Sequence, residues 1–285
     1  MSLAGKKVVI SGASQGFGLA LAKGFAAQGA DLLLGARDLS LLETEAGRLR
    51  ASAAPGQQIL AKRLDVADET SARSFLEAAA SWGKIDLLIN NAGVYGPKGS
   101  LESTDWKAWV EAVQINLMGT VLMCKLALPA LKKSAAPSII NLSGGGATAP
   151  LPRLSAYAAS KAAVVRFTET LAEEWREEGI CVNAVAPGAL NTRLLEEVLE
   201  AGPEKVGQEF YAKSLEQKAK GGASMQEGVS LCLFLAGPQA RGISGKLISA
   251  LWDPWQDFAK LAPQFEKNDI YTLRRIVPKD RGMEF

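Results

Sequence analysis

The chain has 285 residues, 48% of them hydrophobic, and a formal net charge of +2. The nearly balanced charge argues against a nucleic-acid-binding protein, because such proteins neutralise phosphates with an excess of Lys and Arg. The absence of histidine excludes a Ser-His-Asp triad and a histidine-ligated metal, and we expect no metal site. Three widely spaced cysteines indicate a reducing compartment. With no signal-peptide pattern and no apolar run of membrane-spanning length, we expect a cytoplasmic protein that does not bind membranes.

Seven short runs of the sequence are nearly continuous in apolar residues, which is typical of buried strands in parallel sheets. They span residues 6–10, 31–35, 59–66, 85–93, 138–143, 180–188 and 245–250. Longer amphipathic stretches, such as 17–28 and 68–82, separate the runs and predict helices. This alternation predicts an α/β fold, a single-domain Rossmann-type doubly wound parallel sheet of about seven strands with helices on both faces. We expect residues 1–250 to form this dinucleotide-binding and catalytic domain.

Residues 251–285 read as a C-terminal extension rather than a separate domain, because the alternation stops near residue 250. The aromatic side chains of the extension are too apolar for a free tail, so we expect them to pack on a neighbouring subunit of a homo-oligomer. The five on which this expectation rests are Trp252, Trp255, Phe258, Phe265 and Tyr271. An alternative is that the basic residues of the extension, Arg274, Arg275 and Lys279, face an anionic substrate.

The first strand runs into the sequence SGASQGFG, which places Gly12, Gly16 and Gly18 at the turn into the first helix. Glycine at this turn lets the backbone approach a pyrophosphate, which binds at the positive N-terminus of the helix. Three glycines can also form a plain tight turn. Their place at the start of a chain of alternating strands and helices indicates dinucleotide binding.

The end of the second strand bears on the choice of dinucleotide. Ala36 and Arg37 occupy the position where NAD-binding proteins usually carry an acidic residue for the ribose hydroxyl. The guanidinium of Arg37 can pair with the 2′-phosphate of NADP, so the sequence favours NADP, although Arg37 could also be a solvated surface residue. Asp38 keeps NAD open, and it is equally placed to cap the helix that follows.

Tyr157 and Lys161 are four residues apart and therefore lie on one face of a predicted helix. A tyrosine titrates near pH ~10, so it needs help to exchange a proton at neutral pH. A lysine about 6 Å away would stabilise the phenolate by roughly 3 kcal/mol, or about two pKa units. The pair predicts a group that donates and accepts protons, unless it is an ordinary solvated pair on a helix surface.

Six motifs in this order resemble those of the short-chain dehydrogenase/reductase family over roughly residues 5–250. They are the glycine turn GASQGFG, LDV at 64–66, NNAG at 90–93, VQINLMGT at 113–120, YAASK at 157–161 and NAVAPGALNT at 183–192. The resemblance implies a set of cofactor contacts. These are Gly12, Ser14, Gln15, Gly16, Phe17, Gly18, Arg37, Asp65, Val66, Asn91, Ala92, Gly93, Tyr157, Lys161, Pro187, Gly188, Leu190 and Thr192.

The resemblance also implies a reaction, in which hydride passes between nicotinamide C4 and the carbonyl carbon of a small alcohol or ketone. Tyr157 would be the general acid or base, and Lys161 would also hold the nicotinamide ribose. Asn116 would hold a water that relays protons between Lys161 and solvent. Because the family commonly forms dimers and tetramers, we expect a homodimer or homotetramer.

The catalytic serine of the family has no counterpart at its usual position. That serine lies three residues after the asparagine that corresponds to Asn141, and thirteen before the tyrosine, and both counts arrive at Gly144. Ser143 is the neighbouring candidate for the catalytic hydroxyl, if the glycines that follow form a bulge that re-aims it. Ser143 could instead bond only to backbone. Thr148 and Ser155 are further candidates, and a serine introduced at position 144 is expected to raise the turnover of a small ketone.

Two other functions stay open. A nucleotide-sugar-modifying enzyme of related fold shares the Tyr-Lys pair, but its relatives are usually longer and space the glycine turn as G-x-x-G-x-x-G. A cofactor-binding sensor with degraded catalysis would explain Gly144, whereas the intact Asn116, Tyr157 and Lys161 argue against it.

The sequence does not identify the substrate. We expect residues 94–100, the stretch 189–224 and the C-terminal extension to shape its site. The strongly charged stretch 193–220 is a candidate lid.

Overall fold

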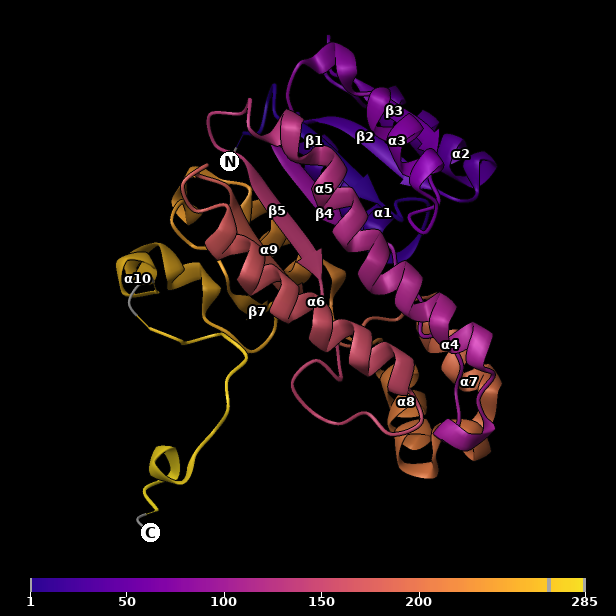
Figure 1. Cartoon of the computed structure of the whole chain (residues 1–285). Coiled ribbons are helices and arrows are strands. Elements are labelled where there is room, and N and C mark those ends of the chain that lie inside the picture. The colour runs from indigo at the N-terminus through magenta and orange to yellow at the C-terminus, as the bar shows by residue number, and fades with distance from the viewer. Residues whose placement is uncertain (1, 266–267, 284–285) are drawn as a thin grey trace.

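The computed structural model describes residues 2–265 and 268–283 of the chain. A seven-stranded parallel sheet with the order β3-β2-β1-β4-β5-β6-β7 forms its centre (Figure 1). The strands are β1 (Lys7–Ser11), β2 (Asp31–Ala36), β3 (Ile59–Arg63), β4 (Leu87–Asn90), β5 (Ser138–Leu142), β6 (Cys181–Ala186) and β7 (Leu247–Ser249). The α/β fold and the parallel sheet predicted from the alternation of strands and helices are confirmed.

Helices cover both faces of the sheet. They are α1 (Gly16–Ala27), α2 (Leu39–Ala51), α3 (Glu69–Glu77), α4 (Trp106–Val113), the π-helical turn η3 (Gln114–Met118), α5 (Gly119–Leu131), α6 (Ser155–Glu174), α7 (Arg193–Val206), α8 (Gln208–Lys220), α9 (Met225–Leu235) and α10 (Phe258–Phe265). Side chains of α1, α2 and α9 share one hydrophobic cluster with Val8 and Ile10 of β1. Side chains of α3, α5 and α6 share a second cluster with Val9. Because successive strand residues point to opposite faces, a continuously apolar strand supplies both clusters.

The strand order creates a crevice at the carboxyl ends of β1 and β4. From β1 the chain builds β2 and β3 on one side, and it then crosses back to place β4 on the other side of β1. Val9 of β1 lies beside Leu88 of β4, so the loops that follow these two strands begin next to each other. In open parallel sheets, ligands bind in the crevice at such a switch in strand order.

One helical stretch bears on the expectation that no apolar run is long enough to span a membrane. α4, η3 and α5 are continuous, and Trp106–Leu131 is long and apolar enough to cross a membrane by length and composition alone. A single helix of this kind is weak evidence for a membrane span. Met123, Cys124 and Ala127 of α5 are buried in the cluster shared with α3 and α6, and a core helix meets the same test of length and composition.

The C-terminal extension folds back on its own chain. Trp255, Phe258 and Phe265 are buried in the cluster shared with α1 and α9. The ring of Tyr271 packs against the rings of Phe258 and Phe265. The expectation that these aromatic side chains pack on a neighbouring subunit is therefore wrong for these four. Trp252, the fifth, is 85% exposed.

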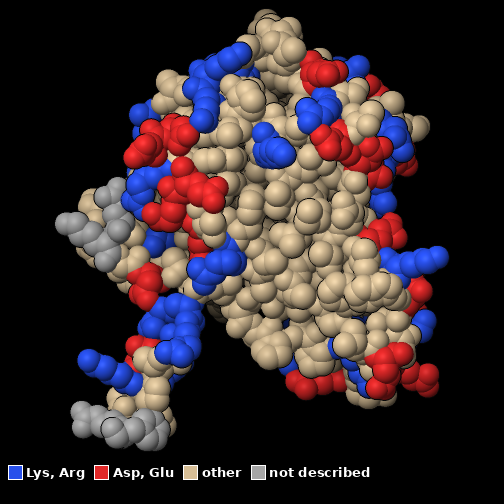
Figure 2. All heavy atoms as spheres, in the orientation of Figure 1, with Lys and Arg blue, Asp and Glu red and all other residues tan. Residues whose placement is uncertain are grey.

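Beyond Leu273 the chain leaves the body of the molecule as an arm (Figure 1). The backbone N–H of Leu273 donates to Glu169 of α6 at 2.6 Å. Basic side chains gather along the arm that follows (Figure 2). One of them, Arg274, pairs at 2.8 Å with Asp280 of the same arm, so part of this charge is neutralised locally.

Candidate active site

A cavity of about 1010 Å³ opens at the carboxyl ends of the strands. It extends from the glycine turn after β1 to residues of α7, α8 and the C-terminal extension. Every residue for which the sequence implies a cofactor contact lines this one cavity, from Gly12 to Thr192. Ser143, Tyr157 and Lys161 line it too. The fold thus brings the predicted cofactor residues and these three catalytic candidates together.

The glycine turn allows close approach to the backbone. Gly12 and Gly16 have positive φ angles of 67° and 56°, and a Cβ atom at Gly18 would overlap the carbonyl oxygen of Gly12. The side chain of Asn91, in the loop after β4, donates to the carbonyls of Ser11 and Gly12 at 3.0 Å each. The turn is therefore compact and is held in place by the neighbouring loop.

α1 begins at this turn without a side-chain cap, since Gln15 at the N-cap position makes no capping hydrogen bond. By contrast, Asp38, Asp68 and Asp105 cap α2, α3 and α4. The uncapped N–H groups of α1 and its helix dipole favour an anion at this end. The residues present therefore fit the pyrophosphate of a dinucleotide.

Arg37 and Asp38 follow β2 at the edge of the same cavity, and both are exposed. The Asp38 carboxylate accepts a hydrogen bond at 3.0 Å from the N–H of Leu41 and thereby caps α2. Of the two roles considered for Asp38, helix capping is the one that the structure shows.

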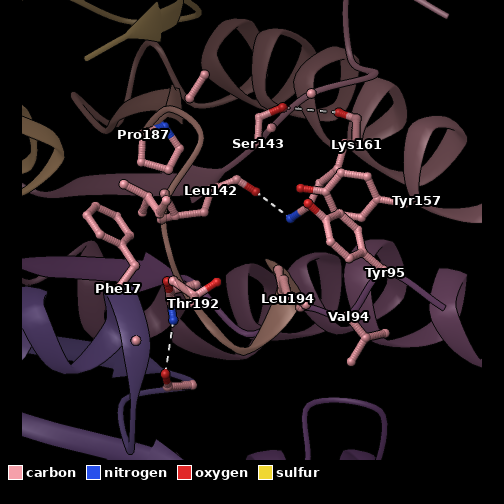
Figure 3. A pocket seen from close by; sticks show the side chains of 18 of the residues that line it. Phe17, Val94, Tyr95, Leu142, Ser143, Tyr157, Lys161, Pro187, Thr192 and Leu194 are labelled. Atoms are coloured by element: carbon pink, nitrogen blue, oxygen red, sulfur yellow. Dashed lines mark hydrogen bonds between the residues drawn. The ribbon is translucent and has the colours of Figure 1, made fainter. Parts of the chain in front are cut away.

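Tyr157 and Lys161 lie one turn apart on α6, and their side chains point into the cavity (Figure 3). The Lys161 ammonium donates to the backbone carbonyl of Leu142, at the end of β5, at 2.7 Å. Its nitrogen lies 5.8 Å from the centre of the Tyr157 ring. Both side chains are buried, with 8% of Tyr157 and 5% of Lys161 exposed, so they are not an ordinary solvated pair.

Burial shifts both groups toward their neutral forms. Desolvation, with a smaller contribution from Tyr95, raises the pKa of Tyr157 above its usual value. Desolvation lowers the pKa of Lys161 to about 8. In the folded chain alone, the pKa of Tyr157 therefore shifts in the direction opposite to the expected lowering, because burial disfavours the charged phenolate. Tyr157 is a neutral phenol at neutral pH, which is the form that donates a proton.

Asn116 lies in the π-helical turn η3 and is fully buried. Its side chain accepts from the N–H of Val94 and donates to the carbonyl of Val94, both at 2.9 Å, and it also donates to the Ser160 hydroxyl at 3.0 Å. A Cβ atom added at Gly93 would lie 3.2 Å from Asn116 Oδ1 and 3.5 Å from Lys161 Nζ. Asn116 is thus behind the cavity wall, where it holds the loop after β4 against α6.

Ser143 follows β5, and its hydroxyl points to α6 rather than to Tyr157 (Figure 3). The hydroxyl donates to the backbone carbonyl of Lys161 at 3.5 Å. The N–H of Ser143 donates to the carbonyl of Val185 at 2.8 Å, which continues the pairing of β5 with β6. Of the two interpretations of Ser143, bonding to backbone is the one that this geometry favours.

Gly144 lies directly against the hydroxyl of Tyr157. A Cβ atom built at position 144 would be 2.3 Å from Tyr157 Oη and 3.3 Å from its Cζ. The tyrosine therefore occupies the space in which a side chain at position 144 would begin. A serine introduced here would have to displace the Tyr157 hydroxyl, so this geometry does not favour the expected gain in turnover, which stays a prediction.

The remaining hydroxyl candidates differ in their access to the cavity. Thr148 lines it, although its side chain is exposed on the loop. Ser155 accepts a hydrogen bond from the Trp109 ring nitrogen at 3.0 Å and is not part of the lining. Within residues 2–265 and 268–283, no group of three His, Cys, Asp or Glu side chains is placed to hold a metal ion.

For the substrate side of the cavity, the sequence predicted only the segments that would line it and not the individual residues. The far wall is mostly apolar and comes from the loop after β4, α7, α8 and the extension, with the side chains of Val94, Leu194, Leu195, Val198, Phe210, Trp252 and Tyr271. Tyr95 lies closest to the catalytic pair: its ring meets that of Tyr157 edge-on, with centroids 4.6 Å apart and an interplanar angle of 74°. No local motif marks Tyr95, because its position depends on how the loop after β4 packs against α6.

Comparison with known proteins identifies the family of this chain. The sequence profile of short chain dehydrogenases matches residues 6–202. Short chain dehydrogenase mpl6 of Monascus purpureus is 34% identical over 261 residues, which cover 87% of this chain and 82% of that protein.

Two solved structures share the fold. The RhlG/NADP active-site complex of Pseudomonas aeruginosa has a TM-score of 0.75 and 27% identity, and the match covers 87% of this chain and 95% of that one. The 3-ketoacyl-(acyl-carrier-protein) reductase of Brucella melitensis complexed with NADH has a TM-score of 0.75 and 31% identity, over 87% and 97% of the two chains. The chain therefore belongs to the short-chain dehydrogenase/reductase family of NAD(P)-dependent oxidoreductases.

Proposed function

We propose that the protein is an NADP-dependent oxidoreductase that interconverts a ketone and an alcohol, with Tyr157 as general acid and base. One observation carries the proposal: Tyr157 and Lys161 line the same cavity as the glycine turn formed by Gly12, Gly16 and Gly18. A cofactor held at the turn and a substrate held at the phenol would therefore share one enclosed space.

The roles of the side chains follow from their positions. When bound, the nicotinamide supplies or accepts the hydride. In reduction, Tyr157 would give its phenolic proton to the substrate oxygen, and the hydride that completes the conversion of ketone to alcohol would come from the reduced cofactor once bound. Lys161, whose pKa of about 8 leaves it mostly protonated at neutral pH, stabilises the phenolate that remains. In oxidation, the phenolate takes the alcohol proton.

The surroundings of Arg37 support a preference for NADP over NAD. Ala36 offers no carboxylate for a ribose hydroxyl, and the adjacent Asp38 is engaged as the cap of α2. The exposed guanidinium of Arg37 is then the group placed to pair with a 2′-phosphate.

The wall beyond Tyr157 supports a bulky and largely apolar substrate. Leu194, Val198, Phe210 and Trp252 contribute apolar surface there. Covering such surface stabilises a bound ligand by about 25 cal/mol per Å² of apolar area removed from water. A small polar substrate would leave this wall in contact with water.

Steady-state oxidation of NADPH across a panel of ketones, alcohols and nucleotide sugars tests the proposal. We expect turnover of at least one bulky ketone, and a loss of ~10²–10⁴-fold in Tyr157→Phe with NADPH affinity unchanged. Tyr211→Phe is the matched control, since Tyr211 lies on α8 and does not line the cavity. Full activity in Tyr157→Phe would contradict the assignment.

A second candidate is a cofactor-binding sensor, and the glycine at position 144 is the observation that favours it. A sensor would bind NADPH in calorimetry and yet oxidise it with no member of the panel. Conversion of a nucleotide sugar without net change of the cofactor would instead indicate the sugar-modifying alternative.

We also propose that the protein forms a homodimer or homotetramer. A broad face over α5 and α6 carries few charged side chains (Figure 2). Large apolar side chains are exposed on and beside α4, namely Leu101, Trp106, Val110 and Met118. A second copy of the chain would cover them. Light scattering should give a multiple of the chain mass, and Trp106→Glu should reduce it; a wild-type monomer at high concentration would contradict the assembly.

A further inference from the structure

The proposed chemistry needs a second hydrogen-bond donor at the substrate oxygen. Negative charge develops on this oxygen in the transition state, and one oriented donor is worth ~10²–10³ in rate. The family's serine is absent at Gly144, and the hydroxyl of Ser143 is directed to the carbonyl of Lys161. The end of β5 therefore presents no hydroxyl to a substrate beside Tyr157.

Tyr95 presents a hydroxyl in the same cavity. Its ring lies edge-on to the Tyr157 ring at a centroid distance of 4.6 Å. Figure 3 shows both phenols directed toward the same part of the cavity, near the Lys161 ammonium. A substrate oxygen that reaches the Tyr157 hydroxyl thus also comes close to that of Tyr95.

We propose that Tyr95 is a catalytic residue, whose hydroxyl donates the second hydrogen bond to the substrate oxygen in place of the missing serine. This inference rests on the proposed function, because it requires a ketone or alcohol bound beside Tyr157. Tyr95 keeps its proton throughout. Tyr157 alone transfers a proton, so the overall reaction is unchanged.

The loop that carries Tyr95 is held from both sides, as a preorganised donor requires. Asn116 pins the preceding residue, Val94, through two hydrogen bonds of 2.9 Å. The Lys98 ammonium lies 5.9 Å from the centre of the Tyr95 ring and pairs with Glu197 of α7 at 3.2 Å. Buried Asn116 on one side and the ion pair on the other fix the direction of the phenol.

The chemical state of Tyr95 suits a donor. Burial, and to a smaller extent the charge of Glu197, raises the pKa of Tyr95. The phenol is therefore protonated at neutral pH and has its hydrogen available for a substrate oxygen. The exposed Thr148 is the competing hydroxyl on the cavity wall.

The arrangement also accounts for the glycine at position 144. Tyr157 lies so close to the backbone of Gly144 that any side chain there would overlap its hydroxyl. In this inference the second donor comes from Tyr95 in the loop after β4, instead of from the end of β5.

Tyr95→Phe tests the inference, because it keeps the ring contact and removes only the hydroxyl. With a ketone that the wild type reduces, we expect kcat to fall by about 100-fold, with KM and NADPH affinity little changed, since the donor acts mainly in the transition state. Tyr211→Phe, outside the cavity lining, should stay within about threefold of wild type, and Thr148→Val tests the competing hydroxyl.

The possible outcomes separate this inference from the proposed function. If Tyr157→Phe is inactive while Tyr95→Phe retains wild-type kcat, the proposed function stands and the role of Tyr95 is refuted. A fall in thermal stability or NADPH affinity that accounts for the loss would show a packing role and refute it as well. A loss in Thr148→Val instead would assign the donor to Thr148. If the wild type reduces no carbonyl compound, both proposals fall.

A wild-type crystal structure with NADP and the product alcohol provides a test without any variant. The inference predicts that the alcohol oxygen lies within hydrogen-bond distance of both the Tyr95 and the Tyr157 hydroxyls. An alcohol oxygen in contact with Tyr157 but beyond hydrogen-bond distance of Tyr95 would overturn it.

Discussion

Gly144→Ala is the substitution that most sharply tests how closely the Tyr157 hydroxyl packs against residue 144. The added Cβ atom would lie 2.3 Å from the Tyr157 hydroxyl oxygen, whereas ordinary van der Waals contact begins at 3.4 Å. The tyrosine must therefore withdraw by about 1 Å, and a misplacement of this size typically costs ~10²-fold in rate. Overpacking of this kind also destabilises a fold by about 1–3 kcal/mol.

The assay is steady-state ketone reduction together with urea unfolding, and Gly145→Ala is the matched control. A Cβ atom at Gly145 meets no atom within 4 Å, so this control should behave as wild type in both measurements. We expect kcat of Gly144→Ala to fall about 100-fold, and Gly144→Ser to lose activity rather than gain it. Turnover of Gly144→Ala equal to that of Gly145→Ala would refute the reasoning.

Three further predictions concern the cofactor, the buried lysine and the extension. In titration calorimetry, NADPH should bind at least about ten-fold more tightly than NADH, and Arg37→Ala but not Arg48→Ala should lose most of this preference; equal affinities in the wild type would remove the 2′-phosphate assignment. Because burial lowers the pKa of Lys161 from 10.5 to about 8, the unfolded chain binds this proton more tightly than the folded chain between these pH values. The free energy of unfolding of the cofactor-free wild type should therefore rise from pH 8 to 10.5, relative to Lys161→Met, by up to about 3 kcal/mol; a difference independent of pH would contradict the shift. Phe258→Ala should cost about 3–5 kcal/mol of stability at every protein concentration, whereas a cost that disappears on dilution would place this ring between subunits.

Local sequence patterns were sufficient to predict much of the fold and the cofactor side of the cavity. The apolar runs predicted the strands because a strand covered on both faces must be apolar throughout. The glycine turn could be found because Gly12 adopts a positive φ angle and a Cβ atom at Gly18 would overlap the carbonyl oxygen of Gly12, six residues earlier. Tyr157 and Lys161 were predicted to share a helix face, and they do because four residues make about one turn.

The substrate side could not be predicted in the same way, because it depends on contacts between distant segments. Tyr95 gains its position from Asn116, which binds Val94 over a separation of 22 positions, and from the Lys98–Glu197 pair, which joins residues 99 positions apart. Phe258 is buried in the core of its own chain. The sequence shows only that this residue is apolar, and an apolar residue can be buried either in its own chain or at a subunit interface. At Gly144 the sequence suggested that a catalytic hydroxyl is missing. The packing shows that the Tyr157 hydroxyl occupies the space in which a side chain at this position would begin.

Transfer of deuterium from NADPH labelled at nicotinamide C4 tests most directly whether this cavity carries out hydride chemistry. The wild type should move the label to the carbinol carbon of the product alcohol, as seen by mass spectrometry, and Tyr157→Phe should form almost none of this product while still binding NADPH. Product alcohol that lacks the label, or equal label transfer by Tyr157→Phe, would contradict the assignment of hydride transfer with Tyr157 as the proton donor.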